Sequence, residues 1–167
     1  MLPSSQDDSS YETIPETFIQ NTSTYLLKII YINKEQQLTY DTNDVLYSKR
    51  MPLLTLEEFI QRIVKYTKME VSTFVYGFVY MQRLFSYEEG FVLGLCNVFR
   101  LLLGAYVLGI KFNEDSKFKN WYYAKILGLT ADVFKDIEVE LFARLKFKLY
   151  VNEEEYSNVY NMLNKNE

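Results

Sequence analysis

The sequence predicts an all-α protein in which several helices surround one buried central helix. Apolar residues recur at intervals of three and four along much of the chain, which is the spacing of one helix face. Residues 101–110 form an unbroken apolar run, and a soluble helix that is apolar on every side has to be enclosed by other helices. A hydrophobic content of 49% and an aromatic content of 17% supply the material for such a core.

The composition also excludes several classes of function. The formal net charge of −4 argues against a general nucleic-acid binder, because phosphate contacts need clustered Lys and Arg. Histidine is absent, so the commonest general base and metal ligand is missing. Cys96 is the only cysteine and is interpreted as a buried core thiol. We therefore expect no metal, no cofactor and no nucleic-acid partner.

The sequence contains no recognisable targeting or membrane segment. The region after Met1 lacks the basic start and apolar stretch of a signal peptide. The longest apolar run is much shorter than the ~20 residues that a membrane helix needs. We expect a soluble intracellular protein, in the cytoplasm, the nucleus or both, without a membrane partner.

The N-terminal part is predicted to precede the main domain. Residues 1–13 are polar and rich in Ser and Asp, which predicts a flexible tail. A helix is predicted over residues 15–33, because its apolar residues recur at helical spacing. Residues 34–50 are polar and are interpreted as a connection. Residues 14–50 are thus a helix with its connection.

The main domain is predicted over residues 51–151. Thr55 and Glu58 form a capping-box pattern that starts its first helix. Ser72 is interpreted as the cap of a second helix over residues 73–84. A strand is the alternative there, because Thr, Phe, Val and Tyr favour strands, although the apolar residues do not alternate with polar ones.

The central helix is predicted over residues 97–112. Gly104, Ala105 and Gly109 are small, and each glycine inside a helix costs ~1 kcal/mol relative to alanine. Close approach of neighbouring helices is the compensation that we expect.

Two more helices follow the central one. Asn120 is interpreted as the cap of a short helix over residues 121–127, which Gly128 ends in a left-handed conformation. Thr130 caps a longer helix whose predicted buried stripe consists of Phe134, Ile137, Leu141 and Leu145.

The domain is predicted to end in a short extended exit, because Phe147, Leu149 and Val151 alternate with polar or less apolar residues. Residues 152–167 are interpreted as a short C-terminal helix or tail that begins at Asn152. The predicted architecture is a five-helix orthogonal bundle around a buried central helix, with an additional N-terminal helix.

Several strings in this layout resemble the cyclin box. The central helix ends in Lys-Phe, and the fifth helix carries a Glu and exits through Leu-x-Phe-x-Leu, as in that family. The resemblance extends to the single-box P/U-type cyclins, which include the phosphate-signalling cyclins of fungi. The motifs of that branch are matched, in order, by Asn97, Arg100-Leu101, Lys111-Phe112, Asp115, Asn120 and Ala124-Lys125.

The sequence departs from the family pattern at four places. Phe99 stands in place of the usual His, Leu127-Gly128 in place of Gly-Gly, and Gln82 in place of Asp. The Met-Arg-x-x-Leu string of mitotic cyclins is replaced by residues 51–54, Met-Pro-Leu-Leu. The residues after Val151 are too few for a second box, so a single cyclin box is expected.

The resemblance implies a regulatory subunit that binds and activates a cyclin-dependent protein kinase, without catalytic chemistry of its own. Such a subunit holds the movable helix of the kinase small lobe in its active position. The resemblance assigns kinase binding to Lys111 and Glu138, and apolar contact to Phe112, Phe142, Phe147 and Leu149. Asp115 is assigned as a partner for a kinase Arg.

Each of these residues also has a purely structural interpretation. Lys111 would neutralise a helix C-terminus, Glu138 would lie on a solvated face, and Asp115 would be an ordinary turn residue. The aromatic side chains would simply belong to the core.

Three other functions are alternatives to kinase activation. A cyclin-fold scaffold without kinase activation is the first alternative. An enzyme would have to use the acidic clusters at 88–89 and 153–155, which have no nucleophile motif or phosphate-binding loop beside them. An RNA binder would stack bases on the 15 tyrosines, but these lack interleaved Lys and Arg.

Overall fold

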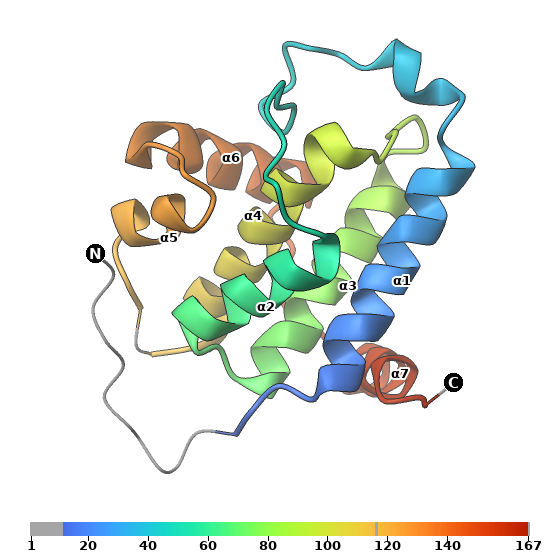
Figure 1. The fold of residues 1–167 in the computed structure, drawn as a ribbon. Helices are drawn as coiled ribbons and strands as arrows, with labels where there is room; N and C mark the ends of the chain where they lie inside the picture. Colours follow the sequence, from blue (N-terminus) through green and yellow to red (C-terminus); the bar gives the residue numbers. More distant parts are fainter. Residues whose placement is uncertain (1–11, 116, 167) are drawn as a thin grey trace.

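The computed structural model describes residues 12–115 and 117–166, and these fold as helices without strands (Figure 1). This confirms the all-α class. The helices are α1 (Glu16–Ile32), the 3₁₀ helix η1 (Gln36–Thr39), α2 (Leu56–Thr67), α3 (Val71–Tyr87), α4 (Leu95–Asn113), α5 (Asn120–Ile126), α6 (Ala131–Arg144) and α7 (Glu153–Leu163).

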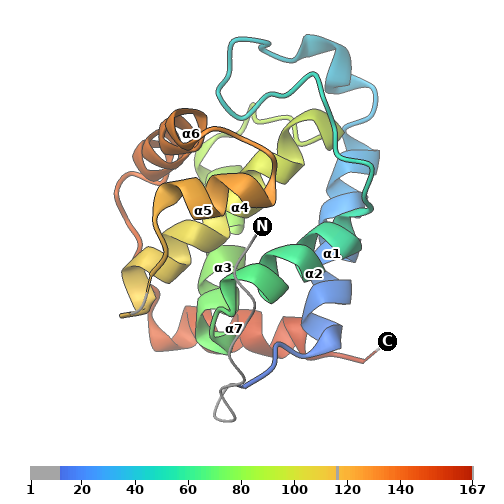
Figure 2. The same ribbon diagram turned by 60° about the vertical axis from the view of Figure 1, so that its left-hand side comes forward.

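Helix α4 is the central helix. Figures 1 and 2 show α2, α3, α5 and α6 arranged around it, and every residue from 101 to 110 is buried. By length and composition α4 resembles a membrane span, with a mean hydropathy of 1.5, but 72% of that window is already buried inside the fold. Its apolar surface is therefore covered by the neighbouring helices, as the continuous apolar run predicted.

The glycines of the core permit the close approach of helices that the sequence predicted. A Cβ on Gly104 would meet Leu141 of α6 at 3.1 Å, and one on Gly109 would meet the backbone oxygen of Thr73 in α3 at 3.2 Å. A Cβ on Gly77 of α3 would lie only 2.4 Å from the ring of Tyr106 in α4. These contacts compensate for the helix propensity that glycine gives up.

The first two elements of the main domain are helices, as predicted, but only one of their two predicted caps is present. Thr55 and Glu58 form the capping box at α2, as predicted. The segment predicted as helix or strand is the helix α3, because its apolar residues are buried on more than one side against α4. The prediction that Ser72 caps this helix is wrong. Ser72 lies inside α3, and its hydroxyl oxygen accepts a hydrogen bond from Asn113 Nδ2 at 2.9 Å.

The predicted end of α5 and the predicted cap of α6 are present, whereas the predicted cap of α5 is not. Gly128 has a φ of +68° and ends α5, while the hydroxyl of Thr130 accepts a bond from the amide of Val133 and caps α6. The predicted stripe of α6 is fully buried, since Phe134, Ile137, Leu141 and Leu145 are all 0% exposed. The prediction that Asn120 caps α5 is wrong. Asn120 is the first residue of the helix, and its side chain contacts α4 instead.

The short extended exit predicted after α6 begins with a turn that the sequence did not predict. Lys146 and Phe147 have φ values of 56° and 60°, so the chain reverses in a left-handed turn before it extends. The amide of Phe147 donates to the carbonyl oxygen of Phe142, and the amide of Lys146 to that of Ala143, as in a Schellman motif. The sequence concealed this turn because no glycine marks it.

Helices α1 and α7 pack outside the five-helix arrangement. Figure 2 shows α7 lying across the ends of α1 and α3. Asn21 of α1 donates to the carbonyl oxygens of Leu163 and Lys165 at 2.8 and 2.9 Å. Asn152 caps α7, as predicted, through a 2.8 Å bond from the amide of Glu155. The flexible tail predicted over residues 1–13 falls mainly on residues outside the described part of the chain.

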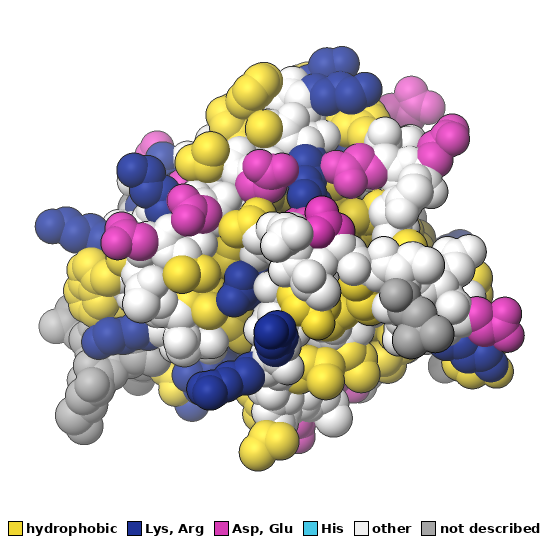
Figure 3. Space-filling view, turned by 90° about the horizontal axis from the view of Figure 1, so that it is seen from above, with side chains coloured by type: hydrophobic (Ala, Val, Ile, Leu, Met, Phe, Trp, Pro, Cys, Tyr) yellow, Lys and Arg dark blue, Asp and Glu magenta, His cyan; other side chains and the backbone are white. Residues whose placement is uncertain are grey.

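The connection between α1 and α2 crosses the opposite end of the bundle, where acidic and basic side chains alternate with apolar ones (Figure 3). Arg144 at the end of α6 holds this connection through Asp44 at 2.8 Å. The same guanidinium lies 3.6 Å from Glu88 and 3.1 Å from Glu140. One partly buried arginine thus ties the connection, the turn after α3 and the end of α6 together.

Candidate functional site

Lys111 and Glu138, to which the resemblance assigns kinase binding, form an ion pair in the structure. Lys111 lies in the last turn of α4 and Glu138 in the middle of α6, and the lysine Nζ is 2.7 Å from the glutamate Oε2. The side chains are 29% and 17% exposed. Glu138 therefore does not lie on a freely solvated face. Lys111 has a specific carboxylate partner in addition to its position at a helix C-terminus.

Asn120 fixes the position of Lys111. Its side-chain oxygen accepts a hydrogen bond from the lysine Nζ at 2.5 Å. Three helices therefore meet at one ammonium group: α4 at its end, α5 at its start and α6 at its middle. Two of the three ammonium donors are directed within the protein, which leaves one for an external acceptor.

Apolar side chains flank this pair on the same surface. Phe112 follows Lys111 and is 49% exposed, while Phe147 is 67% exposed after the turn of α6. Phe142, one helical turn beyond Glu138, is half-buried, and its ring centroid lies 4.9 Å from that of Phe147. Phe112 and Phe147 are therefore not core residues, which removes the structural interpretation for these two aromatics.

Leu149 belongs to this surface through its backbone as well as its side chain. Its side chain is half-buried, and its carbonyl oxygen accepts a 2.7 Å bond from the hydroxyl of Tyr80. Tyr80 contacts Tyr76, whose ring lies 6.3 Å from that of Phe112. A row of α3 tyrosines thus supports the surface between the end of α4 and the exit from α6.

Asp115 lies on the exposed loop after α4, and the ion pairs found between described residues do not include it. Its role as a partner for a kinase Arg stays a prediction. Its neighbour Glu114 is different in character. Burial, with Glu70 nearby, raises the pKa of the Glu114 carboxyl, although Thr73 and a backbone amide donate to it.

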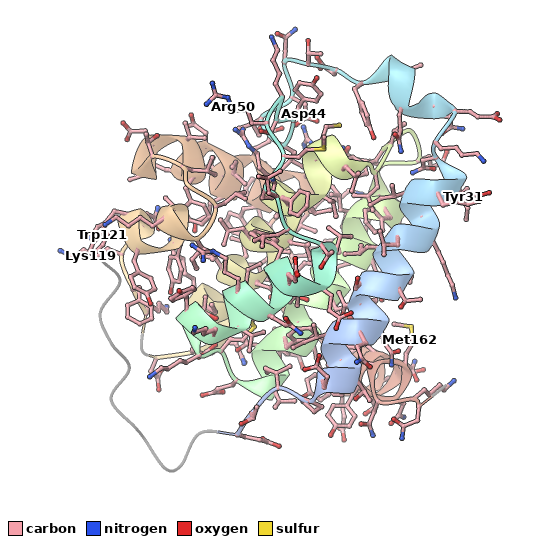
Figure 4. The ribbon with its side chains drawn as sticks, viewed as in Figure 1. Tyr31, Asp44, Arg50, Lys119, Trp121 and Met162 are labelled. Carbon is pink, nitrogen blue, oxygen red and sulfur yellow. The ribbon has the colours of Figure 1, made fainter. Side chains whose placement is uncertain are left out.

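The surface continues onto α5. Trp121 is 49% exposed beside Asn120, and Lys125 Nζ lies 4.9 Å from the centre of its ring. Figure 4 shows Trp121 and Lys119 projecting from the start of α5 at the edge of the molecule. Val139 on α6 and Tyr150 after it are 58% and 70% exposed. Trp121, Val139 and Tyr150 were not singled out in the sequence, because nothing in their spacing separates exposed from buried apolar residues.

A second concave feature lies at the other end of α4. A groove of about 500 Å³ runs between the connection, the first turns of α4 and the turn between α5 and α6. Its lining includes Lys49, Arg50 and Arg100 and no acidic residue, and Arg50 lies on the connection (Figure 4). Cys96 also lines it and is only half-buried. The interpretation of Cys96 as a fully buried thiol is therefore wrong, because α4 begins at the surface.

The chemistry of the site is that of recognition. The described residues contain no group of three or more Cys, Asp or Glu side chains placed to hold a metal ion. What the site offers is a fixed ammonium–carboxylate pair surrounded by exposed aromatic side chains. Such an arrangement can anchor a partner backbone by charge-assisted hydrogen bonds and bury apolar partner residues beside it.

Comparison with known proteins gives a consistent picture. The family model described as Cyclin matches residues 4–149. Cyclin-U2-1 of Arabidopsis thaliana is 36% identical over 104 residues, which cover 62% of this chain and 47% of that protein. Cyclin-P3-1 of Oryza sativa subsp. japonica is 30% identical over 116 residues, which cover 70% and 49%. The chain spans about half the length of these curated relatives.

Proposed function

This chain belongs to the cyclin family, in the branch of the U-type and P-type cyclins, and we propose that it binds and activates a cyclin-dependent protein kinase. Members of the family are regulatory subunits without catalytic activity, so in this proposal the kinase supplies all of the chemistry. The role would be performed inside the cell, where the kinase has access to ATP.

The observation that supports the proposal most is the 2.7 Å pair between Lys111 and Glu138. These are the two positions to which the family resemblance assigns kinase contact. They come from different helices, and both side chains are partly exposed beside Phe112 and Phe147. An ion pair that served the interior alone would not need exposed aromatic side chains on either side of it.

The mechanism follows from differential binding. A protein kinase is active when a helix of its small lobe brings a Glu to the ATP-positioning Lys. In the proposed complex, Lys111 donates its remaining N–H to the backbone of that helix, and Glu138 accepts a backbone N–H. The aromatic residues cover the apolar face of the helix. The active arrangement is favoured because only in it can all of these contacts form together.

Affinity purification of the tagged chain from its own cells, followed by a kinase assay with and without the chain, tests this proposal. We expect a protein kinase to be recovered and its phosphorylation of a generic Ser/Thr substrate to rise when the chain is added. Recovery of partners without any protein kinase would refute the proposal and favour a scaffold role.

A further inference from the structure

The exit segment of residues 146–150 is strained and exposes two aromatic side chains. Lys146 and Phe147 both have positive φ values, a conformation that costs roughly 1 kcal/mol or more for a residue with a side chain. Phe147 is 67% exposed and Tyr150 is 70% exposed. Strain of this kind persists only where the surrounding structure determines the conformation.

The surrounding structure is provided by Arg83 and Tyr80 of α3. Arg83 donates from Nη1 to the carbonyl oxygen of Lys148 and from Nη2 to that of Tyr150, both at 2.7 Å. Tyr80 donates to the carbonyl oxygen between them, that of Leu149, at 2.7 Å. Three successive carbonyl groups are therefore held by two side chains of one helix.

Helix α7 in turn fixes Arg83. Glu155, in the first turn of α7, lies 2.7 Å from Nη2 of Arg83 and also accepts a bond from its Nε at 3.3 Å. The arginine side chain is only 14% exposed, and its planar fork binds two carbonyl oxygens and one carboxylate at the same time. The family match ends at residue 149, so α7 lies beyond it.

We propose that Arg83, held by Glu155 of α7, is a positioning residue for the kinase-binding surface, because it fixes the exit segment that presents Phe147 and Tyr150. The inference rests on the proposed function and adds α7 to it. Phe147 packs against Phe142, which lies one turn from Glu138. If the exit segment moved, Phe147 would no longer be available beside the ion pair. Helix α7 thereby helps to hold a surface that is presented by other segments of the chain.

Arg83→Lys and Glu155→Gln test the inference. Glu155→Gln should change amide exchange and kinase affinity in the same direction as Arg83→Lys but by a smaller factor, because the amide oxygen can still accept a hydrogen bond from Arg83. Lysine keeps the positive charge, but a single ammonium group cannot reproduce the planar fork that reaches two carbonyl oxygens and a carboxylate together. In the isolated chain we expect amide hydrogen exchange over residues 146–150 to accelerate at least tenfold in Arg83→Lys. For the kinase recovered with the wild-type chain, we expect Kd to rise at least tenfold.

A second variant separates positioning from general stability. Glycine adopts positive φ without strain, so adding Lys146→Gly to Arg83→Lys relieves the strain at one of the two positive-φ positions without restoring the contact to α7. We expect it to recover part of the lost kinase affinity. Asn21→Ala is the matched control, because it loosens the far end of α7. It should lower Tm without changing kinase affinity.

Three outcomes overturn the inference. Wild-type kinase affinity in Arg83→Lys would show that the clamp does not position the surface. Equal losses of affinity in Arg83→Lys and Asn21→Ala, or no recovery with Lys146→Gly, would leave Arg83 as a stabilising residue only. In each of these cases the wild-type chain still binds the kinase and the proposed function stands. Failure of the wild-type chain to recover a kinase overturns both.

Discussion

Replacement of Lys111 by alanine should separate partner binding from stability. The side chains of Lys111 and Glu138 are 29% and 17% exposed, so solvent screens their attraction and limits its contribution to folding to about 1 kcal/mol. For a chain of this size that corresponds to a fall in Tm of roughly 2–4 °C. In the kinase complex the partner covers the pair, and loss of one charge leaves the other buried and unpaired, at ~2–5 kcal/mol.

The expected signature is therefore a small loss of stability with a Kd increase of roughly 30-fold or more. Urea unfolding of the isolated chain measures the first quantity, and titration of the kinase recovered with the wild-type chain measures the second. Glu138→Ala should show the same small loss of stability and the same increase in Kd. In the double variant the losses should be less than additive, because each single substitution also leaves the other charge unpaired, a cost that is absent from the double variant.

Lys65→Ala is the matched control, since Lys65 occupies the last turn of α2 as Lys111 does that of α4. If both lysines act only on helix C-termini, the two variants will lose similar stability and neither will lose kinase affinity. That result, or wild-type affinity in folded Lys111→Ala and Glu138→Ala, would refute the assignment of the site.

Three further predictions concern the fold that holds the site. Gly77→Ala should destabilise the protein by about 1–2 kcal/mol in urea unfolding, because the added methyl overlaps the ring of Tyr106 and the overpacking outweighs a propensity gain of ~1 kcal/mol. Arg144→Met should cost about 2 kcal/mol in the same assay, because it leaves the carboxylates of Asp44 and its neighbours without their shared cation. Glu114→Gln should stabilise the protein at pH 7 but not below pH 4, in thermal melts across that range. The folded state raises the pKa of this carboxyl, so wild-type stability falls as pH rises through the folded pKa.

Each of these has a control or an opposing result. Gly90→Ala adds a methyl with nothing within 4 Å and should not destabilise the protein. If folded Arg144→Met binds the kinase as tightly as the wild-type chain, Arg144 serves only to hold the connection between α1 and α2. A stability difference between Glu114→Gln and wild type that is the same at every pH would contradict the burial argument for Glu114.

The helices could be predicted because their causes are local. Periodicity and the Thr55, Thr130 and Asn152 caps depend on residues a few positions apart, and all three caps are present. The errors occur where a distant group competes for a polar side chain. Ser72 binds Asn113 and Asn120 binds Lys111, so neither caps the helix that its position suggested. Propensity describes the isolated segment and cannot include such partners.

Only part of the candidate site could be predicted from the sequence. Lys111 and Glu138 could be identified from the family motifs, but only the structure shows that Asn120 holds the lysine. Arg83, Tyr80 and Glu155 are separated by more than sixty residues from the backbone or side-chain groups that they bind. No spacing rule connects them.

The sequence by itself determined that this chain forms helices around an apolar central one, because burial of a continuous apolar run leaves few other arrangements in water. It also contained the motifs that mark its family. Only the tertiary structure decided which polar groups meet and which aromatic side chains remain outside. Those choices depend on pairs of groups brought together by packing. The segment after the turn at Lys146 is held by Arg83 and Tyr80, contacts that do not exist until the chain has folded.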